Sequence, residues 1–300
     1  MSDFVANFES LTEQIANIKK TSTDEILLKS FDHEEDFTGL CLDLLIETGS
    51  FVCITSCLYP TGKKGWTRDE AIIGGNFVRL YKLISAILDQ TCQHRRETTF
   101  IFGRLAFETI VNLNYIIRFR SPELFESYIR YSLQHENKLL NLIQANISKR
   151  GGEVQAIEQR MINSILKMFK KSGIDSDNNS KVKIKNWGNK NLFDRAKAVD
   201  LDSVYLGAFG GGSHAVHGNW ADILEYNLEI GEDGFNPKLD WRRPRPQILT
   251  TIAFLTVNLL QEYFSSAELS NLQSYFTASL DDLRNRIQVA TEFHEQFLRK

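Results

Sequence analysis

Residues 98–117, TTFIFGRLAFETIVNLNYII, decide the fold. Apolar side chains cover nearly all sides of this segment when it is wound as a helix, which is typical of a helix in the centre of a bundle. Four polar residues, Arg104, Glu108, Asn112 and Tyr115, recur at intervals of four, four and three, so they form one stripe. Because charges in apolar surroundings need polar partners, a second helix is expected to supply them.

Helical spacing of apolar residues also extends on both sides of this segment. Thr67 followed by Glu70 forms a capping box that predicts a helix towards Cys92, and Ser121-Pro122 begins another that we expect to end near Lys149. A single helix is expected across residues 204–224. The sequence therefore predicts an all-α protein, a multi-helix bundle with one small β-hairpin near residues 224–240, turning between Gly231 and Gly234.

Length and composition favour one helical domain over residues 1–300, in which N-terminal helices within residues 1–65 pack on a core of residues 66–300. The net charge of −3 excludes a general attraction to nucleic acid or anionic lipid, so such binding has to be local. The N-terminus lacks a secretory pattern, and the apolar run at residues 248–260 is shorter than the roughly 20 residues of a membrane span. We expect a cytoplasmic protein with no membrane partner and no cofactor.

The expected partner of the polar stripe is the segment SHAVHGNW, residues 213–220. Ser213 and His217 share one face of a helix there, and three glycines before them allow close approach of a backbone or ligand. We expect Arg104, Glu108, Ser213 and His217 to meet in a polar pocket between two central helices. Three interpretations stay open: hydrogen bonds that fix helix register, a catalytic or ligand pocket, and a weaker metal site of His214, His217 and a carboxylate. The third is not adopted, so no metal ligand is assigned.

These residues carry a family resemblance that covers roughly residues 66–240. The R-x-x-x-E helix with Arg104 and Glu108, a later loop with Trp187, and the S-x-x-x-H helix with Ser213 and His217 resemble a bacterial helical family of unknown function. The resemblance implies a helical bundle in which Arg104, Glu108, Ser213 and His217 are shared polar positions. It implies no established activity.

More distantly, the arrangement is similar to the HEPN proteins, helical-bundle ribonucleases and nucleotide-binding proteins frequent in toxin–antitoxin and phage-defence systems. Their Arg-x(4–6)-His motif cleaves RNA without a metal ion. Here the positions that should carry arginine before His217 are glycines. The one literal match, Arg130 to His135, is expected by chance, and we interpret both residues as facing solvent.

Two basic segments are candidate surfaces. Lys181, Lys183 and Lys185 precede Trp187, a combination that could hold a phosphate backbone and stack on a base, or simply form a solvated loop. Arg242, Arg243 and Arg245 are stiffened by two prolines, which favours phosphate or carboxylate binding about as well as a structural role. The 20 phenylalanines also allow a homo-oligomer, although core packing explains them equally well.

The leading functional hypothesis is a metal-independent ribonuclease or nucleotide-acting effector of a bacterial stress or phage-defence system. His217 is the expected general acid or base, Arg104 stabilises phosphate charge, Glu108 orients one of them, and Ser213 donates a hydrogen bond. The expected substrate is RNA or a nucleotide. Its candidate contacts are His214, Asn112, Tyr115, Lys183, Lys185, Trp187, Arg242, Arg243 and Arg245. The alternative is a non-enzymatic helical module that binds a protein or small ligand through a structural polar seam.

Overall fold

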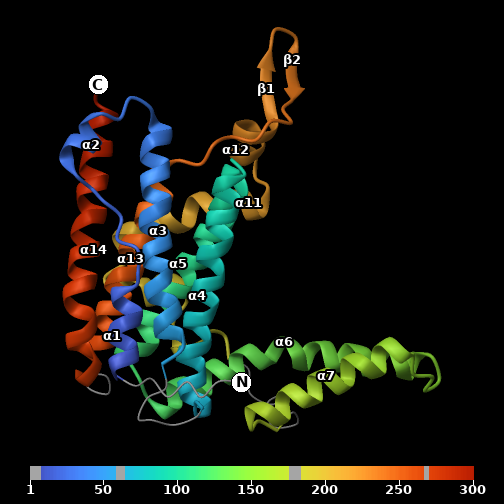
Figure 1. Cartoon of the computed structure of the whole chain (residues 1–300). Helices are drawn as coiled ribbons and strands as arrows, with labels where there is room; N and C mark the ends of the chain where they lie inside the picture. The colour runs from blue at the N-terminus through green and yellow to red at the C-terminus, as the bar shows by residue number, and fades with distance from the viewer. Residues whose placement is uncertain (1–7, 59–64, 176–183, 267–269) are drawn as a thin grey trace. The chain divides into compact units, whose positions relative to one another are not determined.

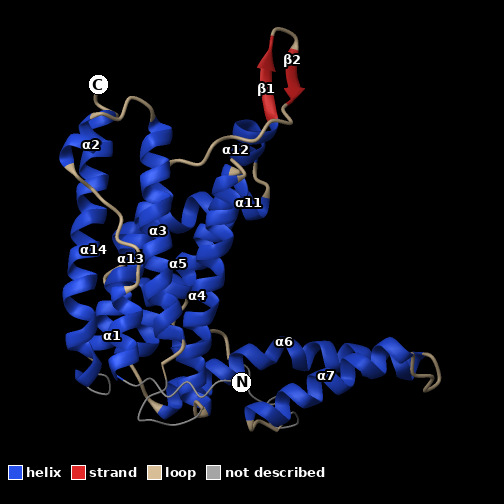
Figure 2. Cartoon of the chain, in the orientation of Figure 1, coloured by secondary structure: helices blue, strands red, loops and turns tan. Residues whose placement is uncertain are grey.

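The computed structural model describes residues 8–58, 65–175, 184–266 and 270–300 (Figure 1). Helices dominate these residues, and one two-stranded hairpin is their only sheet (Figure 2), so the predicted all-α class is confirmed. The helices before residue 200 are α1 (Phe8–Ala16), α2 (Glu25–Lys29), α3 (Glu34–Ser56), α4 (Arg68–Cys92), α5 (Arg96–Arg118), α6 (Pro122–Lys149), α7 (Ala156–Ser172), the 3-10 turn η2 (Trp187–Asn189) and α9 (Leu192–Ala198). The later elements are α10 (Asp202–Tyr205), η3 (Leu206–Gly210), α11 (Gly211–His217), α12 (Trp220–Asp222), η4 (Ile223–Asn227), β1 (Leu228–Gly231), β2 (Gly234–Pro237), α13 (Pro246–Ser265) and α14 (Ser270–Phe297).

Contacts divide the chain into two compact units. Unit 1 comprises Met1–Arg118 and Arg195–Lys300, and unit 2 is the intervening segment Phe119–Asp194. Unit 2 is therefore inserted into the sequence of unit 1. The expected single domain over residues 1–300 stays a prediction.

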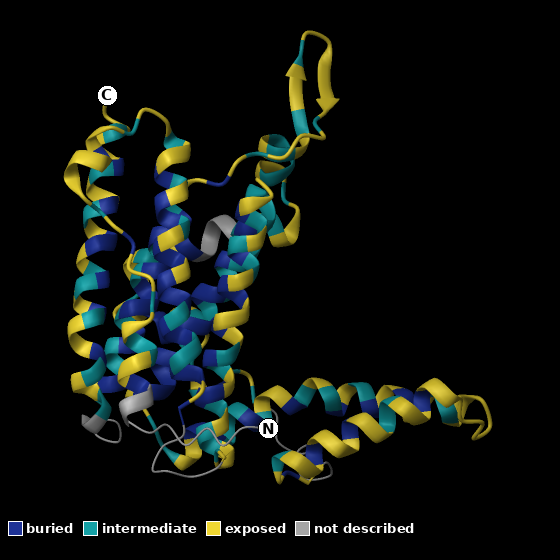
Figure 3. Ribbon diagram, viewed as in Figure 1, coloured by how far each residue is buried: buried dark blue, intermediate teal, exposed yellow. Residues whose placement is uncertain are grey.

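The core of unit 1 lies around α13. This helix packs against α3, α5 and α14, while α4 packs between α3 and α5, as the dark interior of the bundle shows (Figure 3). The Ile248 side chain of α13 packs closely on α5 at Gly103, where an added Cβ atom would lie 2.8 Å from its Cδ1 atom. The N-terminal helix α3 therefore packs on the later helices α4, α13 and α14.

Local start signals set the bounds of several helices. The Thr67 hydroxyl accepts a hydrogen bond from the Glu70 amide at 3.4 Å, and the Glu70 carboxylate accepts from the Thr67 amide at 2.7 Å, which completes the predicted capping box of α4. At the start of α6, the Ser121 hydroxyl accepts from the Leu124 amide at 3.1 Å. These two helices begin where their sequence signals place them.

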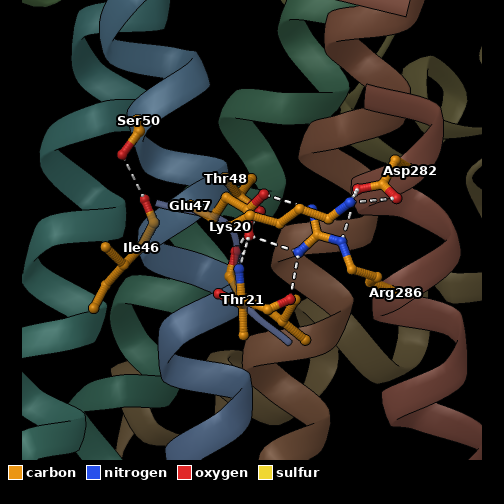
Figure 4. A network of polar contacts seen from close by, with 9 residues as sticks. Lys20, Thr21, Ile46, Glu47, Thr48, Ser50, Asp282 and Arg286 are labelled. Atoms are coloured by element: carbon orange, nitrogen blue, oxygen red, sulfur yellow. Dashed lines mark hydrogen bonds and ion pairs between the residues drawn. The ribbon is translucent and has the colours of Figure 1, made fainter. Parts of the chain in front are cut away.

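A buried ion network ties the N-terminal segment to the bundle (Figure 4). Arg286 of α14 donates to both carboxylate oxygens of Glu47 in α3, at 2.7 and 2.5 Å, and to the Thr21 carbonyl at 2.9 Å. The Thr21 amide donates to Glu47 in turn, at 2.9 Å. Because Glu47 and Arg286 are 4% and 8% exposed, this bidentate pair fixes the relative position of α3 and α14 in a dry environment.

The segment predicted as one helix across residues 204–224 is broken. Helix α10 continues through the π-helical turn η3 into α11, and the chain then leaves the helix at Gly218, whose φ is +55°. Helix α12 and a second π-helical turn, η4, lead to the hairpin, where Leu228 pairs with Pro237 and Gly231 with Gly234. The hairpin is confirmed within its predicted range. The continuous helix is wrong, because Gly218 adopts a left-handed conformation that interrupts it.

Three helices of unit 1, α3, α4 and α5, are long and apolar enough to cross a membrane, judged by length and composition alone. In the structure, 56%, 39% and 61% of their most apolar stretches are buried inside the protein. The expected cytoplasmic location and the absence of a membrane partner stay predictions.

Unit 2 is built from α6, α7 and η2, with α7 and η2 each packed on α6. The Glu158 carboxylate caps α7 by accepting from the Gln155 amide at 3.0 Å and pairs with Arg150 at the end of α6. Gly173, with φ of +66°, ends α7 in a left-handed conformation.

Candidate functional site

The polar stripe of α5 lies in unit 1 and is partly covered by later segments. Arg104, Glu108 and Asn112 are half-buried, and Tyr115 is 5% exposed. Tyr205 of α10 brings a hydroxyl group towards this stripe, and α11 and η3 both pack against α5. The packing of the glycine-preceded helix on α5 is therefore seen, and the meeting of Arg104, Glu108, Ser213 and His217 in one polar pocket stays a prediction.

Tyr205, at the end of α10, lies among the charges of this stripe. Burial raises the pKa of the Tyr205 hydroxyl and the Glu108 carboxylate raises it further, whereas Arg104 and Arg195 act in the opposite direction. Its ring packs edge-on against Phe107, with ring centroids 6.1 Å apart. One hydroxyl group thus stands close to one carboxylate and two guanidinium groups, and it stays protonated at neutral pH.

Arg195 of α9 is the second buried cation of the seam. The residue is 6% exposed, and its Nε atom donates to Oδ1 of Asn112 at 3.0 Å. Burial raises the pKa of the Tyr115 hydroxyl, and the Arg195 guanidinium partly opposes this shift. Arg195 therefore joins Asn112 and Tyr115 to the group around Tyr205.

Arg195 and Tyr205 do not stand out in the sequence. Arg195 is one of three charged residues among the seven of α9, and the only local signal of Tyr205 is its place before the glycine-rich turn. Their position beside the polar stripe depends on how α9 and α10 are placed relative to α5, which only the folded structure shows.

The polar residues of α11 differ in how far they are buried. Ser213 is half-buried, whereas His214 and His217 are exposed. The His214 ring contacts the side chain of Asn219, which also caps α12 by accepting from the Asp222 amide at 3.1 Å. Burial raises the pKa of Asp222 and His214 opposes this shift. His217 thus has a solvent-accessible imidazole on α11, the helix that packs against α5.

The metal alternative finds no support in the described part of the chain. Among residues 8–58, 65–175, 184–266 and 270–300, no group of three or more His, Cys, Asp or Glu side chains is arranged to hold a metal ion. His214 is engaged by an amide rather than by further ligand-type side chains.

The arginine-rich segment before α13 lies at the start of α5. The Arg96 amide donates to the Arg242 carbonyl at 2.9 Å, which joins the two segments through the backbone. Arg242 is half-buried and pairs with Glu225, and the exposed Arg243 pairs with Glu35 at 2.6 Å. Arg245 is exposed and directly precedes α13. Two guanidinium groups of this segment are thus held by carboxylates, and the expected binding of phosphate or substrate by the segment stays a prediction.

The second basic segment belongs to unit 2. Lys185 is exposed, and Lys183 lies outside the described residues. Trp187 is 4% exposed and packs edge-on against Tyr128, with ring centroids 5.1 Å apart. This ring is part of the packing of unit 2, so the expectation that it stacks on a nucleic-acid base is wrong for the described conformation: burial covers its faces.

The described residues form an all-α protein with one small hairpin. The model of a family of unknown function (DUF5677) matches residues 70–235, more than half of the sequence, and the chain belongs to this family. The match spans α4, the polar stripe, unit 2 and α11. No curated protein and no solved structure matches the chain.

Proposed function

We propose that this protein cleaves RNA or a nucleotide without a metal ion, as an effector of a bacterial stress or phage-defence system. The observation that carries the proposal is the group of Arg104, Arg195 and Glu108 around the Tyr205 hydroxyl, beside the helix that bears His217. The distant similarity to HEPN ribonucleases supports the same chemistry.

The chemical roles follow from the charges. Arginine guanidinium groups match phosphate geometry, so Arg104 and Arg195 are suited to stabilise the charge of a phosphoryl group. The protonated Tyr205 hydroxyl is a hydrogen-bond donor for a phosphoryl oxygen, and the Glu108 carboxylate adds a negative charge near that hydroxyl. Burial of Arg195 limits water around the charge, which strengthens these interactions.

His217 is the proposed proton carrier. Its exposed imidazole removes the proton from a ribose 2′-hydroxyl, whose oxygen then attacks the adjacent phosphorus. The bond from phosphorus to the 5′-oxygen breaks, and that oxygen takes up a proton. The products are a 2′,3′-cyclic phosphate and a 5′-hydroxyl, so the reaction needs no metal, oxidant or second substrate.

The direct test is incubation of the purified chain with total RNA in excess chelator. We expect cleavage by the wild-type protein and its loss in His217→Ala and Arg104→Gln, with unchanged melting temperatures. The matched control is His135→Ala, an exposed histidine of α6 that belongs to the one literal Arg-x(4)-His match. Loss of cleavage in His135→Ala, with activity retained in His217→Ala, would move the chemistry away from the seam. Growth arrest on expression, dependent on His217, tests the effector role.

A second candidate function is a non-enzymatic module that binds a partner protein. One observation favours it: large apolar side chains are exposed around the hairpin, with Ile230 78%, Phe235 55% and Leu239 89% exposed. If this is the function, we expect the wild-type chain to cleave no RNA. Glu108→Ala and His217→Ala should then lower the stability of the fold, because the polar seam is structural. Sedimentation of the wild-type chain and of Phe235→Ser reports whether a second copy is the partner.

A further inference from the structure

Two cavities of unit 1 meet at a pair of arginines that have no carboxylate partner among the described residues. The larger cavity, about 400 Å³, lies between α5, α10 and α13, and the smaller, about 260 Å³, lies beside α3. Arg96 and Arg245 line both cavities. Within the described part of the chain, neither guanidinium forms an ion pair, whereas the neighbouring Arg242 and Arg243 both do.

The charges around this pair are mostly positive. Burial lowers the pKa of Arg96, and the nearby cations Arg245 and Arg242 lower it further, whereas Tyr226 and Glu225 oppose the shift. Glu225 and Glu35 are engaged by Arg242 and Arg243, and Glu34 contacts His294 at 3.2 Å. A group of guanidiniums with few free carboxylates is stabilised by an anion, and phosphate matches guanidinium geometry best.

The larger cavity is apolar beyond its arginines. Phe100, Val204, Ala208 and Ile248 contribute to its wall, and Gln247 and Ser203 add polar groups. Oε1 of Gln247 and Nε of Arg96 are buried without a hydrogen-bond partner among the described residues. A buried, unsatisfied amide oxygen and guanidinium nitrogen are costly, and a bound ligand with complementary donors and acceptors would relieve that cost.

We propose that this site binds a nucleoside phosphate, with the phosphate between Arg96 and Arg245 and the base in the larger cavity against Phe100 and Gln247. The volume lies in the range of small-molecule pockets. An aromatic ring and a primary amide are suited to a planar base, which offers both a stacking face and hydrogen-bonding edges.

The site is continuous with the seam. Arg96, Phe100, Arg104 and Glu108 follow one another at four-residue intervals on α5, so the pocket is about 12 Å along the helix from Arg104 at 1.5 Å per residue. The choice of a nucleotide rests on the proposed function, because a flanking nucleotide of an RNA held here would place a neighbouring phosphate nearer to Arg104. The anion site itself rests only on the two cavities and their arginines.

Calorimetric titration of the full chain with each of the four ribonucleoside 5′-monophosphates, the free nucleosides and inorganic phosphate tests the site. We expect at least one monophosphate to bind more tightly than its nucleoside or inorganic phosphate. Arg245→Gln should weaken that binding at least about tenfold, since a charge-assisted hydrogen bond is lost. The control Arg95→Gln removes the same charge one residue from Arg96, but Arg95 stacks on Trp241 and lines neither cavity, so its affinity should stay within about twofold.

Two further variants separate the parts of the proposal. Gln247→Leu should weaken binding of the monophosphate while leaving inorganic phosphate unchanged, whereas His217→Ala should retain binding of both. Equal affinity of wild type and Arg245→Gln overturns the anion site, and equal affinity of wild type and Gln247→Leu overturns the position of the base. Binding that depends on Arg245 in a chain that cleaves no RNA upholds this site and rejects the proposed function; cleavage without such binding does the reverse.

Discussion

Replacing Arg286 by methionine tests how strongly the buried ion network holds the N-terminal segment on the bundle. The substitution keeps a long apolar side chain but removes two hydrogen bonds to the Glu47 carboxylate, one to the Thr21 carbonyl and one to the Asp282 carboxylate. The Glu47 carboxylate, which is 4% exposed in the wild-type chain, then keeps the hydrogen bond from the Thr21 amide in the described network. A buried carboxylate is left without its counter-charge.

The expected cost is large because both partners are buried. Breaking a buried pair from one side lowers the free energy of unfolding by about 3–5 kcal/mol, a large part of the roughly 5–15 kcal/mol that stabilises a domain. In the double variant Glu47→Leu with Arg286→Met, no unpaired charge is left. We therefore expect the double variant to be more stable than Arg286→Met alone.

Urea unfolding followed by circular dichroism measures these differences, with the slope of the transition confirming that the same surface unfolds in each variant. Lys20→Met is the matched control: its ion pair with Asp282 is exposed, at 63% and 42%, and should contribute only about 0–1 kcal/mol. An Arg286→Met variant that loses less than about 1 kcal/mol, or a double variant that loses the sum of both single changes, would falsify this account of the network.

Three further predictions concern single residues. Glu108→Gln should lower the pKa of Tyr205, because the carboxylate that raises this pKa is removed while Arg104 and Arg195 remain. The pKa is obtained by titrating tyrosinate absorbance in chains with Tyr205 and with Tyr205→Phe and taking the difference. An unchanged pKa would show that Glu108 does not act on Tyr205. Cys41, whose pKa burial raises to about 12, should resist alkylation at mildly alkaline pH in the folded chain while the exposed Cys92 reacts; mass spectrometry of the labelled chain decides this, and equal labelling contradicts it. Thr67→Ala should lower the free energy of unfolding by about 1 kcal/mol through loss of the α4 cap, whereas Thr67→Ser should not; equal urea midpoints for all three proteins would contradict the cap.

The helices that the sequence predicts well are those with signals in their own residues. The capping box at Thr67 and the Ser121-Pro122 start act within one turn, so they fix the beginning of α4 and α6 whatever the rest of the chain does. The predicted continuous helix around Gly210–Gly212 is wrong for the opposite reason. Glycine permits several backbone conformations, and packing on α5 selects the π-helical turn and the break at Gly218.

The candidate site divides in the same way. The stripe from Arg104 to Tyr115 is visible in the sequence because its members share one helix, and the packing of α11 on α5 follows from the glycines. Arg195 and Tyr205 come from other helices, so their approach to the stripe depends on long-range packing. Unit 2 shows no change of composition at its boundaries and was therefore not separated from the rest.

The central position of α13 has a consequence for how the chain is made. Helices α3 and α5 bury their apolar faces against α13, which is synthesised after the whole of unit 2. At about 5–20 residues per second, a ribosome needs on the order of ten seconds to add residues 119–246. During that time, two helices apolar enough to cross a membrane are exposed on the nascent chain. We expect newly made chains to depend on chaperones until α13 emerges.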